Sequence, residues 1–354
     1  MRVAVIGCGQ IADLHITEIQ KIEGVELVGV CDLNEIMAEQ AAVRFGVRKY
    51  YTDFRQLLRE QQPEVVHITT QPQSHLPLGK IALEHGAHVY MEKPFTLNAA
   101  EAEELVVCAQ KAGRQVCVGH NYDFDRGAMD ARQLVAEGRL GEVLHVDSAY
   151  SYDLQGSFGR LLLEKPKHWL HDLPGKLFQN VAVHAVCKVT GFIPDPMPVV
   201  QAAGFKLRPE RFGDARDCFH DEVRVFLRGQ RVSGHVVFSS HIRPMLHYMR
   251  LYGTKGTVHV DWHARTVRSE RVSSLPGAIG RLVVPFEHAA EGLGHGLRNA
   301  WRFVNADLQY NDGMNRLFRL FYAAIREGKP SPIPMTEAVR VTRVLDEIIR
   351  QLHS

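Results

Sequence analysis

Hydrophobic residues in the first third of the chain alternate between two spacings, one typical of buried strands and one typical of helices. Short apolar runs rich in β-branched residues predict strands, and stretches with an apolar residue every three or four positions predict the helices between them. Glycines close most of these segments, where a left-handed backbone costs little. The predicted strands are 2–6, 25–31, 64–70, 87–91 and 115–119, and the predicted helices are 11–22, 34–45, 73–85 and 98–112.

The regular alternation of strand and helix predicts parallel strands joined by helical crossovers. We therefore predict an α/β protein in which residues 1–120 form a doubly wound parallel sheet of the Rossmann type, with helices on both faces. Sheets of this kind bind their ligands outside the carboxyl ends of the strands. The loops that follow these strands are therefore the first place to look for functional residues.

The pattern changes after Gly119, because strands now follow one another across short turns with little helix between them. This is typical of an antiparallel or mixed sheet. We predict that residues 121–354 form a substrate-binding α+β domain with a largely antiparallel open sheet, whose C-terminal helices, over about 315–351, pack back on the first domain. An open sheet face favours the pairing of subunits, so we expect a homo-oligomer. The predicted strands are 142–153, 199–206, 222–227, 232–239, 249–252 and 257–261.

Residues 291–303 (EGLGHGLRNAWRF) combine glycines, cations and a tryptophan. We expect a loop that enters a helix here. A mobile lid and a surface-seeking segment are the alternatives.

Composition narrows the range of partners. The chain has 42 Lys and Arg residues against 40 Asp and Glu residues, which provides little long-range attraction for nucleic acid or an anionic membrane. No apolar stretch approaches the ~20 residues that a membrane span needs. The six cysteines include no CxxC pair, and the chain opens on a predicted strand instead of a signal peptide. We therefore expect a cytoplasmic protein with free thiols, no nucleic-acid partner and no membrane span.

A G-x-G-x-x-A motif follows the first predicted strand and opens the first helix. It consists of Gly7, Cys8, Gly9, Gln10, Ile11 and Ala12. Gly7 permits a tight turn, Gly9 lets the backbone approach a pyrophosphate, and Ala12 allows close helix packing. The helix N-terminus offers N–H groups to phosphate oxygens. The motif therefore predicts a dinucleotide site.

Asp32 lies at the end of the second predicted strand, where an acid completes this dinucleotide pattern. A carboxylate there accepts hydrogen bonds from the adenosine ribose hydroxyls and repels a 2′-phosphate. The next residues, Leu33 and Asn34, provide no cation to hold that phosphate. We therefore expect NAD as the cofactor in preference to NADP. The alternative is an acid that only caps the following helix.

Lys93 follows the fourth predicted strand in the sequence Met91-Glu92-Lys93-Pro94. At the carboxyl end of a parallel strand, a lysine can reach both the nicotinamide edge and a substrate hydroxyl. A solvated surface turn is the alternative interpretation of these residues alone.

Four segments together resemble the Gfo/Idh/MocA family. They are GCGQIA at 7–12, HITTQPQSH at 67–75, MEKPF at 91–95 and VGHNYDF at 118–124. The family includes glucose–fructose oxidoreductase, inositol dehydrogenases and many sugar or nucleotide-sugar dehydrogenases. The resemblance covers the whole Rossmann half, and the second half in outline.

The resemblance implies that Thr69, Thr70 and Gln71 line the path from adenosine to nicotinamide. His75 matches the histidine that the family has in this loop. An equally open alternative is that His75 stands at a helix start, forms hydrogen bonds only with neighbouring residues and does not contact the cofactor.

The resemblance also implies roles close to the nicotinamide. Glu92 would help to hold the nicotinamide ribose, and Lys93 would be shared between cofactor and substrate. Asn121 would approach nicotinamide and substrate from the domain junction, and we expect its neighbour Tyr122 on the substrate side.

The second catalytic pattern of the family is an Asp followed four residues later by a His on a helix. The matching stretch, residues 175–184, has Asn180 at the aspartate position and keeps His184. The spacing places both side chains on one helix face. Asn180 can orient a hydroxyl but cannot take its proton, so the resemblance assigns catalysis to His184, Lys93 or both. Because Asn180 departs from the family pattern, a simple assignment as an inositol dehydrogenase is weakened. The alternative for His184 is a histidine that only packs within its helix and has no catalytic role.

The segment 160–171 (RLLLEKPKHWLH) leads toward this helix and is rich in cations. It can hold an anionic substrate, and its tryptophan offers a stacking face for a sugar or a base. The candidate substrate-binding residues here are Arg160, Lys165, His168 and Trp169. The pair His168 and His171 lacks an evident third ligand, and the chain has no HExxH motif, so we expect no metal.

These observations favour an NAD(P)-dependent oxidoreductase that transfers hydride between nicotinamide and a secondary alcohol of a sugar or nucleotide sugar. One alternative is a redox-neutral enzyme, for epimerisation, elimination or glycosidic cleavage, in which tightly bound NAD is recycled within each turnover. Another is a non-catalytic regulatory protein that senses sugar and NAD. Asn180 makes the last of these conceivable, whereas Lys93 and His184 argue against it.

Overall fold

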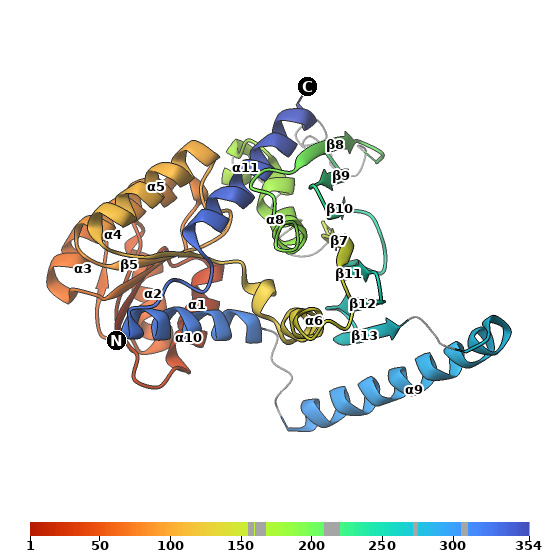
Figure 1. Cartoon of the computed structure of the whole chain (residues 1–354). Coiled ribbons are helices and arrows are strands. Elements are labelled where there is room, and N and C mark those ends of the chain that lie inside the picture. The colour runs from red at the N-terminus through yellow and green to blue at the C-terminus, as the bar shows by residue number, and fades with distance from the viewer. Residues whose placement is uncertain (155–158, 160–167, 209–219, 272–274, 306–310, 354) are drawn as a thin grey trace.

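The computed structural model describes residues 1–154, 159, 168–208, 220–271, 275–305 and 311–353. Two sheets dominate this part of the chain and lie side by side, with helices between them and around the first sheet (Figure 1).

The first sheet is parallel throughout, as the alternating pattern predicts. In spatial order its strands are β3 (Tyr50–Tyr51), β2 (Glu26–Cys31), β1 (Arg2–Ile6), β4 (Val65–Ile68), β5 (His88–Met91) and β6 (Val116–Val118). The order reverses direction between β1 and β4, which is the position where doubly wound sheets bind ligands. Strand β3 was not predicted, because two residues are too short to show a period.

Helices cover both faces of this sheet. They are α1 (Gln10–Gln20), α2 (Glu35–Phe45), α3 (Phe54–Gln61), α4 (His75–Glu84) and α5 (Ala99–Ala112). Asn34 and Asn98 cap α2 and α5 through their side chains, and Gly46 and Gly113 end these helices with a left-handed backbone. Figure 1 shows α4 and α5 on one face and α1 on the other. The prediction missed α3.

The second sheet is mixed and mostly antiparallel, as predicted. In spatial order its strands are β13 (Thr266–Arg271), β12 (Gly256–Asp261), β11 (His247–Gly253), β7 (Val143–Ser151), β10 (Ser233–Ser239), β9 (Glu222–Arg228) and β8 (Val199–Phe205). Only β7 and β10 pair in parallel among these described strands. The prediction missed β13, whose sequence TVRSER has too few apolar residues to suggest burial.

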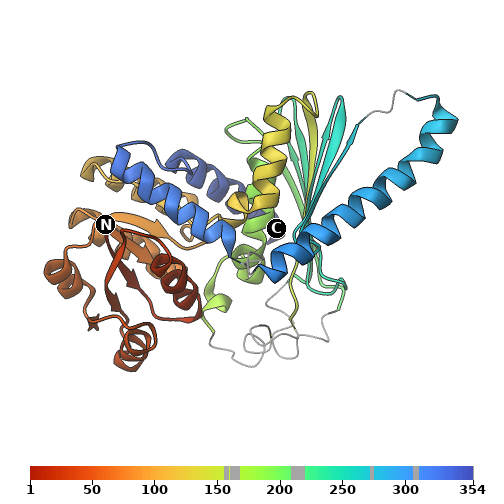
Figure 2. The same ribbon diagram turned by 90° about the horizontal axis from the view of Figure 1, so that it is seen from below.

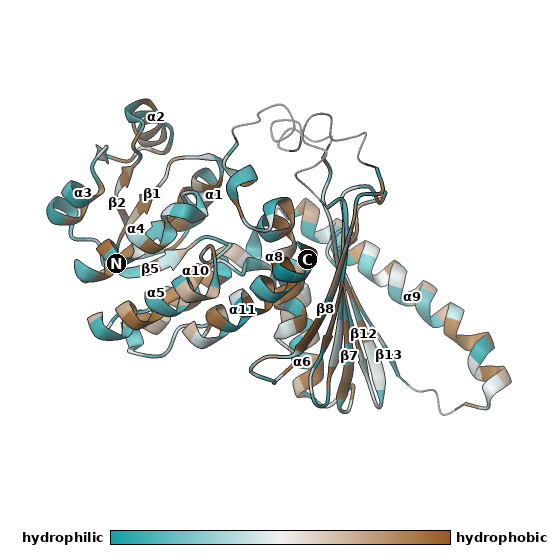
Figure 3. Cartoon of the chain, turned by 90° about the horizontal axis from the view of Figure 1, so that it is seen from above, coloured by the Kyte–Doolittle hydropathy of each residue, from teal (hydrophilic) through white to brown (hydrophobic). Residues whose placement is uncertain are grey.

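Helices α6 (Arg126–Ala136), α8 (Lys176–Thr190) and α11 (Met335–Leu352) lie against one face of the second sheet, and Figures 2 and 3 show no helix packed flat on the other face. Helix α9 (Gly277–Val304) stands on that open side. The expected loop at 291–303 was therefore wrong, because these residues continue a single helix in spite of their three glycines. The prediction also missed α6.

Two hydrophobic cores hold the chain together, one under each sheet. Helix α10 (Asp312–Glu327) packs in the first core through Phe318, Phe321 and other apolar residues. Helix α11 contributes Val339 to the first core and Leu345 to the second, so it connects them. Both C-terminal helices therefore return to the Rossmann part of the chain. None of the described helices has the length and apolar character to cross a membrane.

Candidate active site

The glycine turn after β1 leaves open space above the start of α1. Gly7 has a φ of 91°, and a Cβ there would lie 2.7 Å from Thr70 Cγ2. Gly9 precedes α1, no side chain caps this helix start, and a Cβ on Gly9 would meet no atom within 4 Å. Cys8 and Ala12 are buried beneath the turn. This arrangement suits a phosphate group at the helix N-terminus.

The remaining two residues of the motif point in different directions. Gln10 is exposed and Ile11 is half-buried against the first core. The turn therefore presents backbone and one polar side chain to a ligand.

Asp32 lies beside the glycine turn at the end of β2. Its Oδ2 accepts a hydrogen bond from Cys8 N at 2.8 Å, and its Oδ1 accepts one from Asn34 N at 2.9 Å. The carboxylate thus ties the turn to the loop after β2. Arg44, a cation whose charge acts on Cys8 in this turn, is bound to Asp13 at 2.9 Å.

The loop after β4 closes the other side of the turn. Thr69 Oγ1 is placed to donate to Ile6 O or Gly7 O, at 2.9 and 2.7 Å. Thr70 Oγ1 accepts a hydrogen bond from Ser74 Oγ at 2.6 Å, and Gln71 is exposed.

His75 is buried, and its ring lies among backbone carbonyl groups. Its Nδ1 lies 3.1 Å from the carbonyl oxygens of Pro94 and Phe95, and its Nε2 lies 3.2 Å from Thr70 O. Burial lowers the pKa of His75, against the opposing effect of these carbonyls. The ring therefore joins the loop after β4 to the turn that carries Lys93.

Glu92 is buried in a cluster of polar side chains that was not predicted from the sequence. Its Oε1 lies 2.9 Å from His15 Nε2, and its Oε2 accepts a hydrogen bond from Lys93 N at 3.1 Å. His15 Nδ1 also lies 3.0 Å from His67 Nδ1, and His67 Nε2 lies 2.7 Å from the Tyr322 hydroxyl of α10. Burial raises the pKa of Glu92, but the hydrogen bond and charge of His15 and the charge of Lys93 outweigh it, so the net shift is downward. The polar positions of α1 and β4 alone gave no sign of this contact.

Lys93 reaches from the end of β5 to helix α8 in the other half of the molecule. Its Nζ donates to Asn180 O at 3.1 Å and lies 3.4 Å from Asn180 Oδ1. Burial lowers the pKa of Lys93, and the negative charge of Glu92 offsets part of this effect. Two of the three predicted catalytic residues are thereby in direct contact.

His184 lies one helical turn after Asn180 on α8, and both side chains are 7% exposed. Its Nδ1 has no hydrogen-bond partner in the described part of the chain. Burial lowers the pKa of His184 well below its ordinary value, and the neighbouring cations Lys93 and Lys188 add to the effect. The imidazole is therefore neutral at pH 7 and able to accept a proton.

Lys188 follows one further turn along α8 and is a buried cation that the sequence analysis missed. Its Nζ lies 2.7 Å from His247 Nε2 and 3.6 Å from the centre of the Trp262 ring. Burial lowers its pKa to about 8. A lysine within the apolar run VAVHAVCKVTGF was the available signal, since only a specific partner keeps such a residue buried.

Tyr122 connects this cation to the candidate catalytic centre. Its ring lies edge-on to His184, with centroids 4.7 Å apart, and edge-on to His247, with centroids 4.6 Å apart. The neighbouring Asn121 Oδ1 accepts a hydrogen bond from the Tyr90 hydroxyl at 2.8 Å. The predicted pair at the domain junction therefore does lie between the two halves of the molecule.

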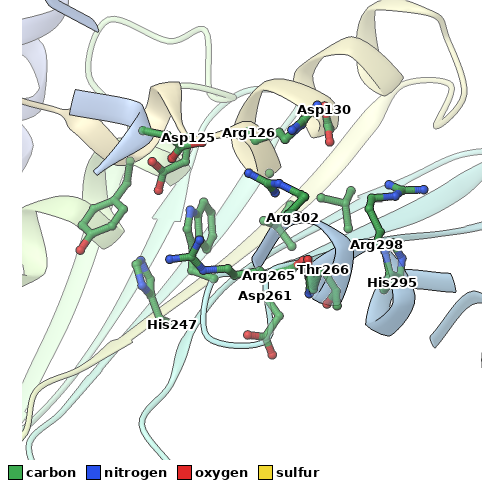
Figure 4. A pocket seen from close by; sticks show the side chains of 17 residues that line it. Asp125, Arg126, Asp130, His247, Asp261, Arg265, Thr266, His295, Arg298 and Arg302 are labelled. Carbon is green, nitrogen blue, oxygen red and sulfur yellow. Dashed lines mark hydrogen bonds between the residues drawn. The ribbon is translucent and has the colours of Figure 1, made fainter. Parts of the chain in front are cut away.

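A cavity of about 280 Å³ begins at Tyr122 and His247 and extends between α6, the β12–β13 hairpin and α9. Figure 4 shows charged side chains of both signs around it. The basic residues are Arg126, Arg265, Arg298 and Arg302, and the acidic ones are Asp125, Asp130, Asp261 and Asp312. Burial and the charge of Asp312 raise the pKa of Asp125 to about 8. Such a lining suits a polar ligand.

The structure describes only part of the predicted substrate loop. Arg160 and Lys165 lie outside the described residues. His168 Nδ1 accepts a hydrogen bond from Leu170 N at 3.3 Å, and Trp169 O accepts one from Gln73 Nε2 at 3.2 Å. Trp169 therefore lies against the loop after β4, on the side of the molecule where the cofactor motif lies.

Three buried side chains that are able to bind a metal ion lie close together at α8. The ligand atoms of His120, Asp123 and Cys187 lie within 4.8 Å of one another. The Asp123 carboxylate, however, is already 3.2 Å from the Arg132 guanidinium. An arginine thus provides the positive charge beside this carboxylate.

Two family models match this chain. A model described as oxidoreductase family, NAD-binding Rossmann fold (GFO_IDH_MocA), matches residues 1–120. A model described as the GFO/IDH/MocA C-terminal domain matches residues 128–259.

Curated relatives match this chain over different lengths. A myo-inositol 2-dehydrogenase of Thermotoga maritima is 25% identical over 266 residues, covering 74% of this chain and 75% of its own. An alpha-N-acetylgalactosaminidase of Shewanella oneidensis is 27% identical over 164 residues, covering 44% of this chain and 36% of its own. The first curated relatives are matched over only 34% to 44% of their length.

Solved structures share the fold over the whole chain. The WlbA dehydrogenase of Bordetella pertussis, in complex with NADH and UDP-GlcNAcA, superposes with a TM-score of 0.80 at 19% identity and covers 100% of this chain and 95% of its own. At this identity the likeness establishes the architecture alone.

Proposed function

The chain belongs to the Gfo/Idh/MocA family of oxidoreductases, and on this premise we propose that it is an NAD-dependent dehydrogenase acting on a secondary alcohol of a sugar or nucleotide sugar. The observation that carries the proposal is the contact between Lys93 and Asn180, which brings the lysine at the cofactor end of β5 next to the His184 helix. A hydroxyl placed there meets a hydrogen-bond donor and a proton acceptor at once.

The residues around the glycine turn fit a dinucleotide. Gly9 and the start of α1 would hold the pyrophosphate, Asp32 the adenosine ribose, and Thr69 with Thr70 and Gln71 the path toward the nicotinamide. Asp32 supports NAD over NADP, because its carboxylate repels a 2′-phosphate and Arg44 is bound to Asp13. Glu92 and His75 would act by fixing the turn that carries Lys93, since their side chains are bound to His15 and to backbone carbonyls.

The proposed reaction separates a hydride from a proton. When bound, NAD supplies a nicotinamide that accepts the hydride from the substrate carbon. Neutral His184 would take the hydroxyl proton. Lys93 donates a hydrogen bond to the same oxygen and stabilises the negative charge that develops on it. The alcohol thereby becomes a carbonyl group, and Asn180 keeps Lys93 in position.

The substrate would extend from this centre along Tyr122 into the cavity lined by the arginines and aspartates. We propose that Asn121, Tyr122, Trp169 and His168 contact it, together with Arg160 and Lys165. A cavity of this size beside the catalytic centre supports a substrate larger than a simple monosaccharide. We further propose a division at residue 120 between the cofactor domain and the substrate domain, and a homo-oligomer as the assembled form.

A second function is supported by the names of three relatives, two glycosyl hydrolase family 109 proteins of Akkermansia muciniphila and one protein of Shewanella oneidensis. The Shewanella oneidensis protein is named for glycosidic cleavage, which is redox-neutral overall. If NAD takes part in such a reaction, it has to be regenerated within each turnover. Lys93 and His184 would then serve a first step that removes a hydride and a proton.

Mass spectrometry of the small molecules released by denaturing the purified protein separates the two functions. Stoichiometric NAD or NADH would favour recycling, and substrate assays must then follow altered sugars. Protein free of nucleotide would favour a dissociable cofactor, and NADH formation is then measured with sugars and nucleotide sugars. If the protein carries no nucleotide and also fails to bind added NAD in titration calorimetry, both functions are overturned. NAD and sugar binding without conversion of any substrate would indicate the regulatory alternative.

A further inference from the structure

Four buried polar side chains form a row that leads from the turn of Lys93 to helix α10. The row begins at Glu92, whose Oε1 lies 2.9 Å from His15 Nε2, and it continues from His15 Nδ1 to His67 Nδ1, 3.0 Å away. It ends at Tyr322, whose hydroxyl lies 2.7 Å from His67 Nε2. None of these four residues is more than 4% exposed. Each polar atom of the row therefore has to find its hydrogen-bond partner inside the protein.

Aromatic side chains hold the two imidazole rings of the row in place. The His67 ring stacks on Tyr90, with centroids 4.7 Å apart. Phe318 of α10 lies edge-on to the His67 ring at 4.7 Å and tilted against the His15 ring at 5.1 Å. Rotation of either ring by half a turn would place carbon atoms where its nitrogens now meet polar partners. The packed core thus fixes the ring planes, and the polar partners fix the direction in which the nitrogens point.

The chemistry of the two ends of the row determines where its protons are. Burial opposes the ionised form of Glu92, but the contacts with His15 and Lys93 lower the pKa of Glu92 overall. Its carboxylate can only accept a hydrogen bond, so His15 Nε2 has to carry a proton. At the other end, burial raises the pKa of Tyr322 well above its ordinary value, so the hydroxyl keeps its proton.

The protons in the middle of the row follow from these ends. Burial and the neighbouring His15 lower the pKa of His67 well below its ordinary value, so its ring is neutral and carries one proton. If His15 is neutral too, its bare Nδ1 accepts from His67 Nδ1, and the bare His67 Nε2 accepts from Tyr322. If His15 is a cation, every bond reverses, and the Tyr322 proton has no acceptor among the described residues. Acid favours this second arrangement, whereas the first satisfies every proton of the row.

We propose that Tyr322, on the C-terminal helix α10, is a positioning residue of the cofactor site. Its hydroxyl donates to His67 Nε2, and His67 Nδ1 donates to His15 Nδ1. His15 Nε2 in turn donates to Glu92 Oε1. All three hydrogen bonds run toward the carboxylate, so each one polarises the next. The other carboxylate oxygen accepts from Lys93 N at 3.1 Å, so both oxygens are fixed.

Loss of the Tyr322 hydroxyl would disturb the row as far as Glu92. Without this donor, the bare His67 Nε2 is a buried acceptor with no partner, which is unfavourable. If the His67 proton moves to Nε2 instead, two bare Nδ1 atoms face each other at 3.0 Å. In both states the bond between His15 and Glu92 is less firmly held. The effect on NAD rests on the proposed function, in which the turn beside Glu92 holds the nicotinamide half.

Nuclear magnetic resonance of the full chain, labelled with ¹⁵N in its histidine rings, tests the row at neutral pH without any substrate. The ¹⁵N shift distinguishes a ring nitrogen that carries a proton from a bare one. We expect one proton on His15, at Nε2, and one on His67, at Nδ1. The signals are assigned by their loss in His15→Gln and His67→Gln. A proton on His67 Nε2, or two protons on His15, would overturn the proposed direction of the row.

Tyr322→Phe tests whether the row positions the cofactor site, because it removes the hydroxyl and keeps the ring. Titration calorimetry should show NAD affinity about 2- to 10-fold lower, the effect of one hydrogen bond. The matched control is Tyr51→Phe, which removes a buried hydroxyl of the same core that binds Glu60 at 3.0 Å, and it should leave NAD affinity unchanged. His15→Leu interrupts the row, so adding Tyr322→Phe to it should cause no further loss.

Three results would contradict the positioning role. The first is unchanged NAD affinity in Tyr322→Phe, and the second is an equal loss in Tyr322→Phe and Tyr51→Phe. The third is a full additional loss when Tyr322→Phe is combined with His15→Leu, because the tyrosine would then act by another route. A wild type that binds no NAD would overturn the proposed function and the cofactor role together, whereas the ring protons judge the row separately.

Discussion

Lys93 Nζ lies 3.1 Å from the carbonyl oxygen of Asn180, and this contact joins the cofactor half of the molecule to the helix of His184. The two residues are 87 positions apart in the chain. Asn180 stands where the family pattern has an aspartate, so the lysine is held by neutral oxygens in place of a carboxylate. Several properties of the proposed centre follow from this arrangement.

Removal of Lys93 or His184 should abolish turnover, and removal of His184 should leave cofactor binding intact. Lys93→Ala and His184→Ala are each expected to lower kcat by at least about 100-fold, the usual contribution of a positioned acid or base. NAD affinity, measured by titration calorimetry, should change little for His184→Ala because this residue lies on α8. Lys80→Ala, which removes a surface lysine, is the control. Near wild-type turnover in both site variants would refute the mechanism.

Restoring a carboxylate at position 180 should shift the pH profile upward. Asn180→Asp places a negative charge beside Lys93 and one turn from His184, which favours the protonated form of both and raises both pKa values. If neutral His184 accepts the substrate proton, the acidic limb of kcat/KM should move to higher pH by about one unit. Asn98→Asp, at the distant cap of α5, should leave the limb in place. An unmoved limb in Asn180→Asp would contradict the role of His184 as base.

The buried histidines should make the fold sensitive to mild acid. Burial lowers the pKa values of His67, His184 and His247 well below the ordinary value near 6.5. Below pH 6.5 the unfolded chain therefore binds protons that the folded chain does not, and the free energy of unfolding falls as the pH falls. The slope should be up to about 1.4 kcal/mol per pH unit for each histidine.

Urea unfolding between pH 7.5 and 5.5 measures this slope. His247→Gln keeps an acceptor for Lys188 and removes one titrating ring, so its slope should be shallower than that of the wild type. Equal slopes in the two proteins would show that His247 does not contribute.

Cofactor preference should depend on the Asp32 carboxylate. Asp32→Ser removes the charge that opposes a 2′-phosphate, so the ratio of NAD affinity to NADP affinity is expected to fall at least about tenfold. Binding of both nucleotides is compared by fluorescence or calorimetry, with Asp53→Asn, at the cap of α3, as control. A wild-type preference for NADP would show that the assignment from Asp32 is wrong.

The two motif glycines should respond differently to substitution. Gly7→Ala forces a side chain into a backbone with φ of 91° and against Thr70, so we expect a loss of about 1–3 kcal/mol in the free energy of unfolding. A Cβ on Gly9 would meet no atom within 4 Å, so Gly9→Asp should keep the stability of the fold, while NAD binding is lost because the new carboxylate occupies the phosphate site. Calorimetry and thermal melts measure both. If Gly9→Asp bound NAD normally, the proposed cofactor site would be incorrect.

Local signals predicted much of this molecule correctly. The strands β1, β2, β4, β5 and β6 have continuous apolar runs because parallel strands are buried on both faces, and this makes them visible in the sequence. The glycine turn and Asp32 are close in the structure because strand ends of one sheet meet at one edge. The elements that were missed, such as β3 and β13, are short or exposed and show no clear period. Helix α9 was misjudged because its apolar stripe is interrupted by glycines that usually end a helix.

The sequence by itself determined the Rossmann pattern, the mixed second sheet, the family, and the presence of Lys93, Asn180 and His184 as candidates. Only the tertiary structure decided that Lys93 bonds to Asn180, that Glu92 is bound to His15, and that Lys188 lies buried behind Tyr122. It also decided that the Tyr322 hydroxyl of α10 lies against His67. The physical reason is range: periodicity and motifs report interactions between residues a few positions apart, whereas pairing, burial and charge at the site depend on segments that only folding brings together.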